Sequence, residues 1–195
     1  MPRHCDRLDG PRTQAVAAEV IDLYRHCYAA PPWSETPEQL AGYPAKLAAS
    51  TVRPGFTALT ARDLTGRLTG ICYGWPTPTD LSGNPVYDAV VRAFGPHTAA
   101  ALTHGALEVA ELFVHPDTQG QGIGRTLLTR ATAAWSTAWL ITDPDSPAAD
   151  LYRHLGWQES GPLPRDLYPQ LQLSLFTLTT SVQDPAAVRA FSKAM

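Results

Sequence analysis

The spacing of apolar residues along the chain predicts a series of helices and strands. Within residues 13–29, apolar side chains recur every three or four positions, as at Val20, Tyr24 and Tyr28, which is typical of an amphipathic helix. A short strand is expected before it, at residues 3–8. The other expected elements are a helix beginning within residues 34–38 with Pro44 as a potential break, a hairpin of strands 56–61 and 68–75, a short helix at 86–94, a strand at 106–114, a helix opening at Gly122 whose apolar stripe continues to Ala134, Trp135 and Ala138, a strand at 139–142, a helix at 146–155, a strand at 171–178 and a loose helix after Asp184.

The chain is expected to fold as one domain over residues 1–195. Its 195 residues suffice for a sizeable core, and no repeat or domain linker interrupts them. Residues 76–105 form an irregular insertion between strands, which we expect to be a substrate lid or a disordered loop. Residues 183–195 read as a C-terminal tail.

Composition and charge exclude several classes of function. A net charge of −3 argues against general nucleic-acid binding and against a polybasic membrane surface, and no apolar run is long enough to span a bilayer. The N-terminus lacks the apolar segment of a signal peptide. Three widely spaced cysteines form neither a metal motif nor a disulfide framework. We therefore expect a cytoplasmic protein without a metal.

A glycine-spaced turn is the most informative local feature. Gly120, Gly122 and Gly124 follow the strand at 106–114 and lead directly into a helix. The backbone N–H groups of such a turn point outward at the positive end of the helix dipole, so the turn can hold a phosphate group. Glycines that serve only packing are the alternative explanation. The third glycine of a dinucleotide-binding GxGxxG turn and the GK[ST] of a P-loop are both missing.

Two motifs together resemble the GNAT N-acetyltransferase superfamily. The run Gln119–Gly124 fits that family's Q/R-x-x-G-x-G/A signature, and Asp145–Trp157 is similar to its N-x-x-A-x-x-L/F-Y-x-x-x-G-F/W block. The resemblance covers roughly residues 13–180. It implies an α/β GNAT fold, in which a mixed, mostly antiparallel sheet of six or seven strands is splayed between strands 4 and 5 and carries helices on both faces.

The resemblance also implies acetyl-CoA as the acyl donor and suggests which residues bind it. Asp145 departs from the family's usual asparagine, which replaces an amide donor by an acceptor and puts a contact there in doubt. Arg153 is a candidate for a CoA phosphate, or else a solvated helix residue. The remaining implied cofactor-binding residues are the turn Gln119, Gly120, Gln121, Gly122, Ile123, Gly124 and Arg125, the strand edge Leu112, Phe113 and Val114, and Ala148.

Three residues are candidates for acid–base chemistry. Tyr152 matches the position at which many GNAT enzymes place the general acid, with a core aromatic as the alternative. Glu108 lies eleven residues before Gln119, the offset of the base glutamate in histone-acetylating members of the family. Glu111 is the competing base, because a regular strand would place it on the apolar face with Leu107, Val109 and Phe113, where desolvation raises a carboxyl pKa. Glu111 could equally be a structural carboxylate paired with an arginine, and a strand bulge would swap these faces. His115 could relay a proton, but a solvent-facing loop residue is the simpler expectation.

The expected function is acetylation of a primary amine on a small molecule, by direct attack in a ternary complex. Trp33 and Trp75 border the segments that vary with the acceptor in GNAT proteins, so they are candidate substrate walls. Four acids could form a rim for a polycation such as an aminoglycoside or polyamine: Glu35, Glu38, Asp80 and Asp88. A protein or peptide acceptor, and a non-catalytic acyl-CoA or small-molecule binder, are the alternatives. The final strand and the tail are candidate surfaces of a homodimer.

Overall fold

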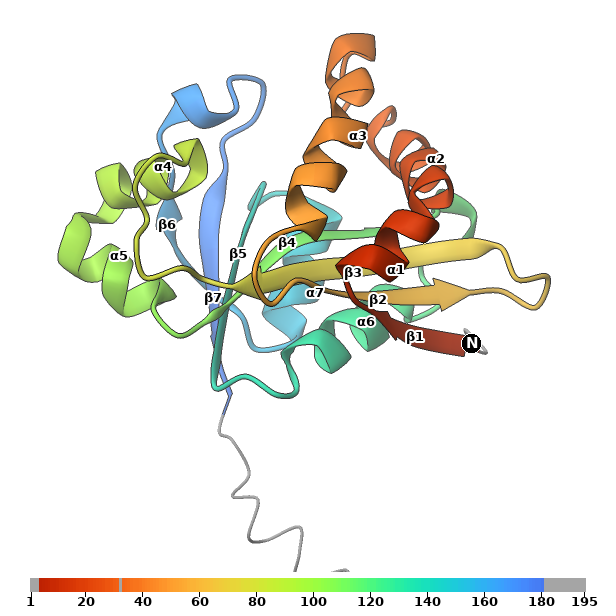
Figure 1. Ribbon diagram of the computed structural model, residues 1–195. Coiled ribbons are helices and arrows are strands. Elements are labelled where there is room, and N and C mark those ends of the chain that lie inside the picture. Colours follow the sequence, from red (N-terminus) through yellow and green to blue (C-terminus); the bar gives the residue numbers. More distant parts are fainter. Residues whose placement is uncertain (1–3, 32, 181–195) are drawn as a thin grey trace, which may run out of the picture.

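Seven strands form one mixed sheet in the computed structural model, which describes residues 4–31 and 33–180 (Figure 1). The strand order is β1-β2-β3-β4-β5-β7-β6, and every neighbouring pair is antiparallel except β4 and β5, which run parallel. The expected mixed, mostly antiparallel sheet is thus confirmed. The strands are β1 (His4–Leu8), β2 (Thr57–Arg62), β3 (Leu68–Pro76), β4 (Leu107–Val114), β5 (Thr137–Thr142), β6 (Gln158–Pro162) and β7 (Ser174–Thr179).

Helices cover both faces of the sheet and bury three apolar clusters against it (Figure 1). On one face, α6 and α7 pack over the centre of the sheet. On the other, α2 and α3 cover β3 and β4, while α4 and α5 form a separate cluster with β5 and β7. The helices are α1 (Gly10–Ala15), α2 (Ala17–Tyr28), α3 (Pro37–Thr51), α4 (Pro85–Phe94), α5 (Pro96–Thr103), α6 (Ile123–Thr132) and α7 (Pro147–His154), with short 3₁₀ turns η1 (Pro116–Thr118) and η2 (Arg165–Leu167).

The sheet splits between its fourth and fifth strands. β4 and β5 pair only at Leu107 with Ala138 and at Glu108 with Trp139, after which the two strands separate. From that point on, the edge of β4 that faces β5 has no strand partner in the described ranges. The expected splay between strands 4 and 5 is confirmed, and it opens the sheet where the glycine turn begins.

A β-bulge in β4 changes which face its side chains occupy. Tyr73 pairs with Glu111, but the next residue, Gly74, pairs with Val109, so Ala110 is the extra residue. A side chain at Gly74 would overlap the carbonyl oxygen of Glu108, which explains a glycine at this position.

The bulge corrects the expected faces of the two glutamates. Leu107 and Val109 pack under α6, whereas Phe113 packs on the opposite face beneath α2 and α3. Glu111 shares the face of Phe113 and not that of Leu107 and Val109, because the extra residue inverts the alternation. Glu108 faces the same side, toward Trp75. Both carboxylates therefore point into one region of the molecule.

Helix boundaries differ from the expected ones at several points. The helix expected at 13–29 is two helices, α1 and α2, separated at Val16. The helix α3 begins at a capping box on Thr36 and continues through Pro44, with Tyr43 and Leu47 buried against the sheet. Proline at this position removes one backbone hydrogen bond, and the buried contacts of the helix outweigh that loss.

The second half of the chain brings further corrections. α6 ends at Thr132, so the apolar stripe expected to continue to Ala138 actually passes into β5. The insertion at 76–105 contains the expected helix α4, and a second one, α5, that the sequence reading missed along with β6. The expected helix after Asp184 lies outside the described residues. No helix in the ranges that the structure describes is both long and apolar enough to cross a bilayer.

Candidate active site

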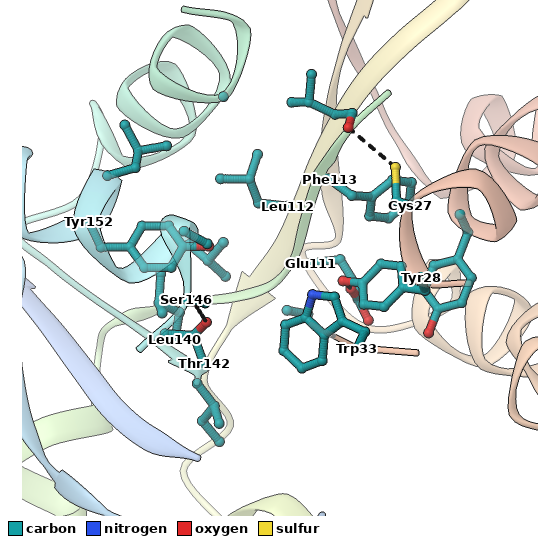
Figure 2. Close-up of a pocket in the computed structure, with 18 of the residues that line it drawn as sticks. Cys27, Tyr28, Trp33, Glu111, Leu112, Phe113, Leu140, Thr142, Ser146 and Tyr152 are labelled. Atoms are coloured by element: carbon teal, nitrogen blue, oxygen red, sulfur yellow. Dashed lines mark hydrogen bonds between the residues drawn. The ribbon is translucent and has the colours of Figure 1, made fainter. Parts of the chain in front are cut away.

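A cavity of ≈ 970 Å³ lies between the splayed strands β4 and β5. α2 and α3 form one wall, and the first turns of α6 and α7 form the other (Figure 2). The residues predicted to bind the cofactor, the candidate acid and bases and the two candidate wall tryptophans line this cavity, except Gln121, Asp145 and Arg153. The motifs of the sequence thus converge on one enclosed space.

The glycine turn leaves the N-terminus of α6 open toward the cavity. Gly122 is the N-cap residue, with a φ of 78°, and no side chain caps the helix. Gly120 also has a positive φ, of 74°. Both positions require glycine for conformation rather than space, since a Cβ would meet nothing there. Gly124 is helical and packs against Leu151 of α7. Free N–H groups at the N-terminus of a helix can bind an anion.

The unpaired edge of β4 continues from that turn along the cavity. Leu112 and Val114 line the cavity with half-buried side chains. The carbonyl of Val114 accepts hydrogen bonds from Gln119 Nε2 at 3.0 Å and from Cys27 Sγ at 3.3 Å. Gln119 therefore fixes the turn to the end of the strand. An extended ligand can lie along this edge and bond to backbone groups that lack a strand partner.

Glu108 is buried, with 7% of its surface exposed, and is held by two donors. Its Oε2 accepts hydrogen bonds from Trp75 Nε1 at 2.7 Å and from the hydroxyl of Tyr87. Burial raises the pKa of Glu108, while these hydrogen bonds and the positive charge of Arg53 lower it to a smaller extent. The net effect is a carboxyl pKa above its ordinary value, which suits a base working near neutral pH.

Glu111 is equally buried but has both oxygens engaged. Oε2 accepts a hydrogen bond from the hydroxyl of Tyr28 at 2.6 Å, and Oε1 pairs with Lys46 Nζ at 2.5 Å. The negative charge of Glu111 raises the pKa of Lys46, which therefore stays charged. Figure 2 shows Glu111 beside Tyr28 and Trp33 on the right-hand wall of the cavity. The ion pair ties α3 to β4.

Tyr152 lies on the opposite wall, across the cavity from Glu111 (Figure 2). It is 5% exposed, and its ring packs against Trp157 and Phe176, with centroids 5.9 and 6.3 Å away. Its hydroxyl has no hydrogen-bond partner among the residues that the structure describes. Burial raises the pKa of Tyr152, so the hydroxyl is a proton donor at neutral pH. Tyr152 is thus a core aromatic that also borders the cavity, and its role as general acid remains a prediction.

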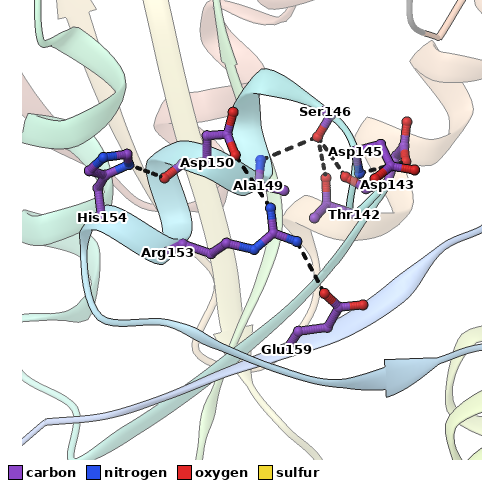
Figure 3. A network of polar contacts seen from close by, with 9 residues as sticks. All are labelled: Thr142, Asp143, Asp145, Ser146, Ala149, Asp150, Arg153, His154 and Glu159. Carbon is purple, nitrogen blue, oxygen red and sulfur yellow. Dashed lines mark hydrogen bonds and ion pairs between the residues drawn. The ribbon is translucent and has the colours of Figure 1, made fainter.

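The start of α7 places Ala148 in the cavity but directs two other predicted residues elsewhere (Figure 3). Ser146 caps the helix by accepting a hydrogen bond from the N–H of Ala149. The exposed Asp145 precedes this cap and lies outside the cavity lining. Arg153 pairs with Asp150 at 3.4 Å and Glu159 at 3.1 Å, also outside the lining. Both remain predictions as cofactor contacts, and this arrangement does not bring them to the cavity.

The acceptor end of the cavity is lined by aromatic side chains. Trp33 is half-buried and lies against Tyr28 and Tyr168, with ring centroids at 5.4 and 6.1 Å. Trp75 is almost fully buried and reaches the cavity while donating to Glu108. The two tryptophans thus lie where a substrate wall was expected.

Two further expectations are corrected. His115 is buried rather than solvent-facing, and its Nδ1 accepts a hydrogen bond from the N–H of Asp117 at 3.2 Å, which caps η1. Burial lowers its pKa. The expected acidic rim does not form, since Glu35 is the only one of its four members that lines the cavity.

Within residues 4–31 and 33–180, no three ligand-type side chains gather into a potential metal site.

Several residues of the site escaped the sequence reading. The two glutamates accept hydrogen bonds from Lys46 of α3, Tyr28 of α2 and Tyr87 of α4. Arg53, two residues beyond the end of α3, donates to Tyr87. The helical spacing of Tyr28 indicates a core position only, and no sequence feature singles out Tyr87. No local motif marks the two cations; the one signal is the rarity of lysine, since the chain holds only Lys46 and Lys193.

Comparisons with known proteins agree with this geometry. Residues 82–159 match the family described as "Acetyltransferase (GNAT) domain". No curated protein matches the sequence. Among solved structures, the ribosomal-protein-S18-alanine N-acetyltransferase from Escherichia coli aligns with a TM-score of 0.63 and 16% identity, over 93% of this chain and 96% of that one.

Two further solved structures share the fold. Aminoglycoside 6'-acetyltransferase type Ii aligns with a TM-score of 0.60 and 17% identity, over 90% of this chain and 96% of that one. The spermidine/spermine N-acetyltransferase SpeG from Vibrio cholerae aligns with a TM-score of 0.54 and 14% identity, over 98% and 99% of the two chains.

Proposed function

We propose that this chain, whose residues 82–159 match an acetyltransferase (GNAT) domain and whose fold is shared with solved N-acetyltransferases, moves the acetyl group of acetyl-CoA to a primary amine of a small molecule, by direct attack in a ternary complex. The observation that carries the proposal is the cavity itself. An open helix N-terminus, a free strand edge, a tyrosine hydroxyl and two carboxylates all border one continuous space.

The donor would bind along the split in the sheet. The pyrophosphate fits the N–H groups of the turn from Gln119 to Arg125, where Gly120 and Gly122 allow close approach. The pantetheine arm fits the unpaired edge of β4 at Leu112 and Val114, where backbone groups can bond its amides. This placement brings the thioester between Tyr152 and the two carboxylates.

Glu108 is the better candidate for the base. Its Oε1 has no hydrogen bond within the described residues, whereas both oxygens of Glu111 are engaged. Its raised pKa lets it take a proton from an ammonium, directly or through water. Glu111 instead orients Lys46 and Tyr28 and adds negative charge beside the incoming amine.

In the proposed reaction, acyl transfer is coupled to proton transfers at Glu108 and Tyr152. The ammonium gives one proton to Glu108, and the freed nitrogen lone pair attacks the thioester carbonyl carbon. The carbon–sulfur bond then breaks, and the Tyr152 hydroxyl protonates the departing thiolate. The tyrosinate recovers a proton from the new amide nitrogen, and Glu108 releases its proton to solvent. No cysteine nucleophile is needed, because burial raises the pKa of Cys27, the cysteine that lines the cavity, to about 12.

Acyl transfer measured with purified protein tests the proposal. Acetyl-CoA is offered with aminoglycosides, polyamines, amino acids and short peptides, and both free thiol and acetylated amine are quantified. We expect thiol and acetylamine in equal amounts with one class of small amine. Transfer to peptides alone would instead support a protein acceptor. Acetyl-CoA binding without transfer to any amine would contradict the proposal and support the non-catalytic alternative.

A further inference from the structure

An arginine without an acidic partner lies at the acceptor end of the cavity. Arg53, at the end of α3, is half-buried and lines the cavity. Its guanidinium lies over the ring of Trp75, 4.4 Å from the centroid, and donates one hydrogen bond to the hydroxyl of Tyr87 at 3.1 Å. Within the described ranges no carboxylate lies within ion-pair distance of it. A guanidinium carries five N–H donors in a planar fork, so most of them are left for a ligand.

This guanidinium lies close to the proposed base. The hydroxyl of Tyr87 contacts Arg53 on one side and Glu108 on the other, so a single oxygen separates the cation from the carboxylate. One ligand can therefore meet both charges only if its own cation and anion are a few bonds apart. A free α-amino acid has this arrangement, with its ammonium and its carboxylate on one carbon atom.

The second cation of the wall is already neutralised. Lys46 pairs with Glu111, and its positive charge reaches Glu35 and Glu108 as well. Arg53 and Lys46 together oppose the three carboxylates that border this region, which makes it a poor site for a polycation. A carboxylate beside Arg53 would form two parallel charge-assisted hydrogen bonds.

We propose that the acceptor is a free α-amino acid, with its carboxylate on Arg53 and its amine at Glu108. The inference rests on the proposed acetyl transfer and names its substrate class. The aromatic side chains of Tyr28, Trp33 and Tyr168 surround the remaining space, which suits an apolar or aromatic side chain. The product is the N-acetyl amino acid, released together with the free thiol of CoA.

Paired acceptors that differ only at the carboxyl group test this inference. L-phenylalanine is compared with L-phenylalaninamide, and L-leucine with L-leucinamide, by thiol release and product mass. We expect kcat/KM to be roughly tenfold or more higher for each acid, because the amide cannot form charge-assisted bonds to the guanidinium. Equal use of acid and amide, or preference for polyamines, would overturn the inference and leave the proposed acetyl transfer intact. Absence of transfer to every amine would overturn both.

Variants of Arg53 test whether this residue causes the preference for the free acid over the amide. Arg53→Gln should lower the ratio of kcat/KM for L-phenylalanine to kcat/KM for the amide by roughly tenfold or more, through the KM of the acid. Because Arg53 also acts on the pKa of Glu108, any effect on the base applies to both acceptors and cancels in this ratio. Arg53→Lys should retain part of the preference, because it keeps the charge but not the fork. Arg12→Gln, an exposed site on α1 outside the cavity, is the control. An unchanged acid-to-amide ratio in folded Arg53→Gln would overturn the assignment.

Discussion

At the scale of single residues, two glutamates three positions apart have different environments, from which we infer different roles. Glu108 accepts two neutral hydrogen bonds and keeps one oxygen open, while Glu111 is paired with Lys46. Burial raises the pKa of the first carboxyl, and its partners offset only part of that rise. A carboxyl that resists ionisation is a stronger base once it is ionised.

Glu108→Gln is predicted to lower kcat by about 10²–10⁴-fold, the usual contribution of a general base. The wild-type rate should fall on its acidic side at a pH above the ordinary glutamate range, since the base must be ionised, and this limb should disappear in the variant. Glu111→Gln is the matched comparison and should keep the acidic limb. A pH–rate profile in which only Glu111→Gln lost the limb would reverse the two assignments.

The same substitution has a consequence for stability. A carboxyl whose pKa is raised by folding contributes stability that is present at low pH and is lost as pH rises through the folded pKa. Glu108→Gln removes this loss, and its amide oxygen can still accept from Trp75 and Tyr87. Thermal unfolding should therefore show the variant gaining stability relative to wild type between acidic and neutral pH. A relative loss over that interval would contradict the burial argument.

At the scale of elements, two local irregularities build the site. The bulge at Ala110 turns Glu108 and Glu111 toward the same wall, and the left-handed turn at Gly122 starts α6 with free N–H groups. Neither feature belongs to a regular strand or helix. Each places polar groups at the split in the sheet, where β4 and β5 cease to pair.

The backbone conformation of the glycine turn predicts different effects of alanine substitution at Gly122 and Gly124. Gly122→Ala places a side chain at a φ of 78°, which should lower the free energy of unfolding by about 1–2 kcal/mol and weaken acetyl-CoA binding. Gly124→Ala is the control, because that residue is helical and a Cβ would meet Leu151 at 3.4 Å, an ordinary contact. Calorimetric titration and chemical denaturation measure both effects. Equal affinities and stabilities in the two variants would contradict the role assigned to the turn.

At the scale of the whole molecule, the cofactor half of the site could be predicted and most of the acceptor half could not. Gln119 to Arg125 and Ala148 lie in contiguous motifs, where local sequence fixes the backbone. Lys46 and Tyr87 reach the glutamates from helices that are 20 or more residues away in the chain, and Arg53, just beyond α3, contacts Tyr87. Such contacts depend on how helices pack on the sheet, which apolar spacing does not specify.

The fold likewise contains strands that the sequence predicts and features that it does not. The sequence predicts the strands β2 and β3, which are apolar and separated by a hairpin turn, within two residues of their ends. The strand β6 was missed because Gln158–Pro162 is polar, contains a glycine and a proline, and lies at the edge of the sheet. The bulge in β4 could be foreseen only as an alternative, since it depends on the close approach of Gly74 to Glu108.

One wall of the cavity comes from α2 and α3 and the other from α6 and α7, and we propose that both walls act on one reaction. Tyr152 of α7 faces Glu111 of β4 across the space in which acetyl-CoA would lie (Figure 2), and Glu108 lines the same cavity. Tyr152→Phe removes one hydroxyl and keeps the ring that packs on Trp157 and Phe176, so folding should be preserved.

The most direct measurement is therefore single-turnover acetyl transfer by Tyr152→Phe, with acetyl-CoA affinity determined on the same sample. We predict that the rate falls by about 10²–10⁴-fold, because the thiolate loses its proton donor, while the dissociation constant of acetyl-CoA changes by less than about threefold. An unchanged transfer rate would remove Tyr152 from the mechanism and contradict the assignment of the two walls to one reaction.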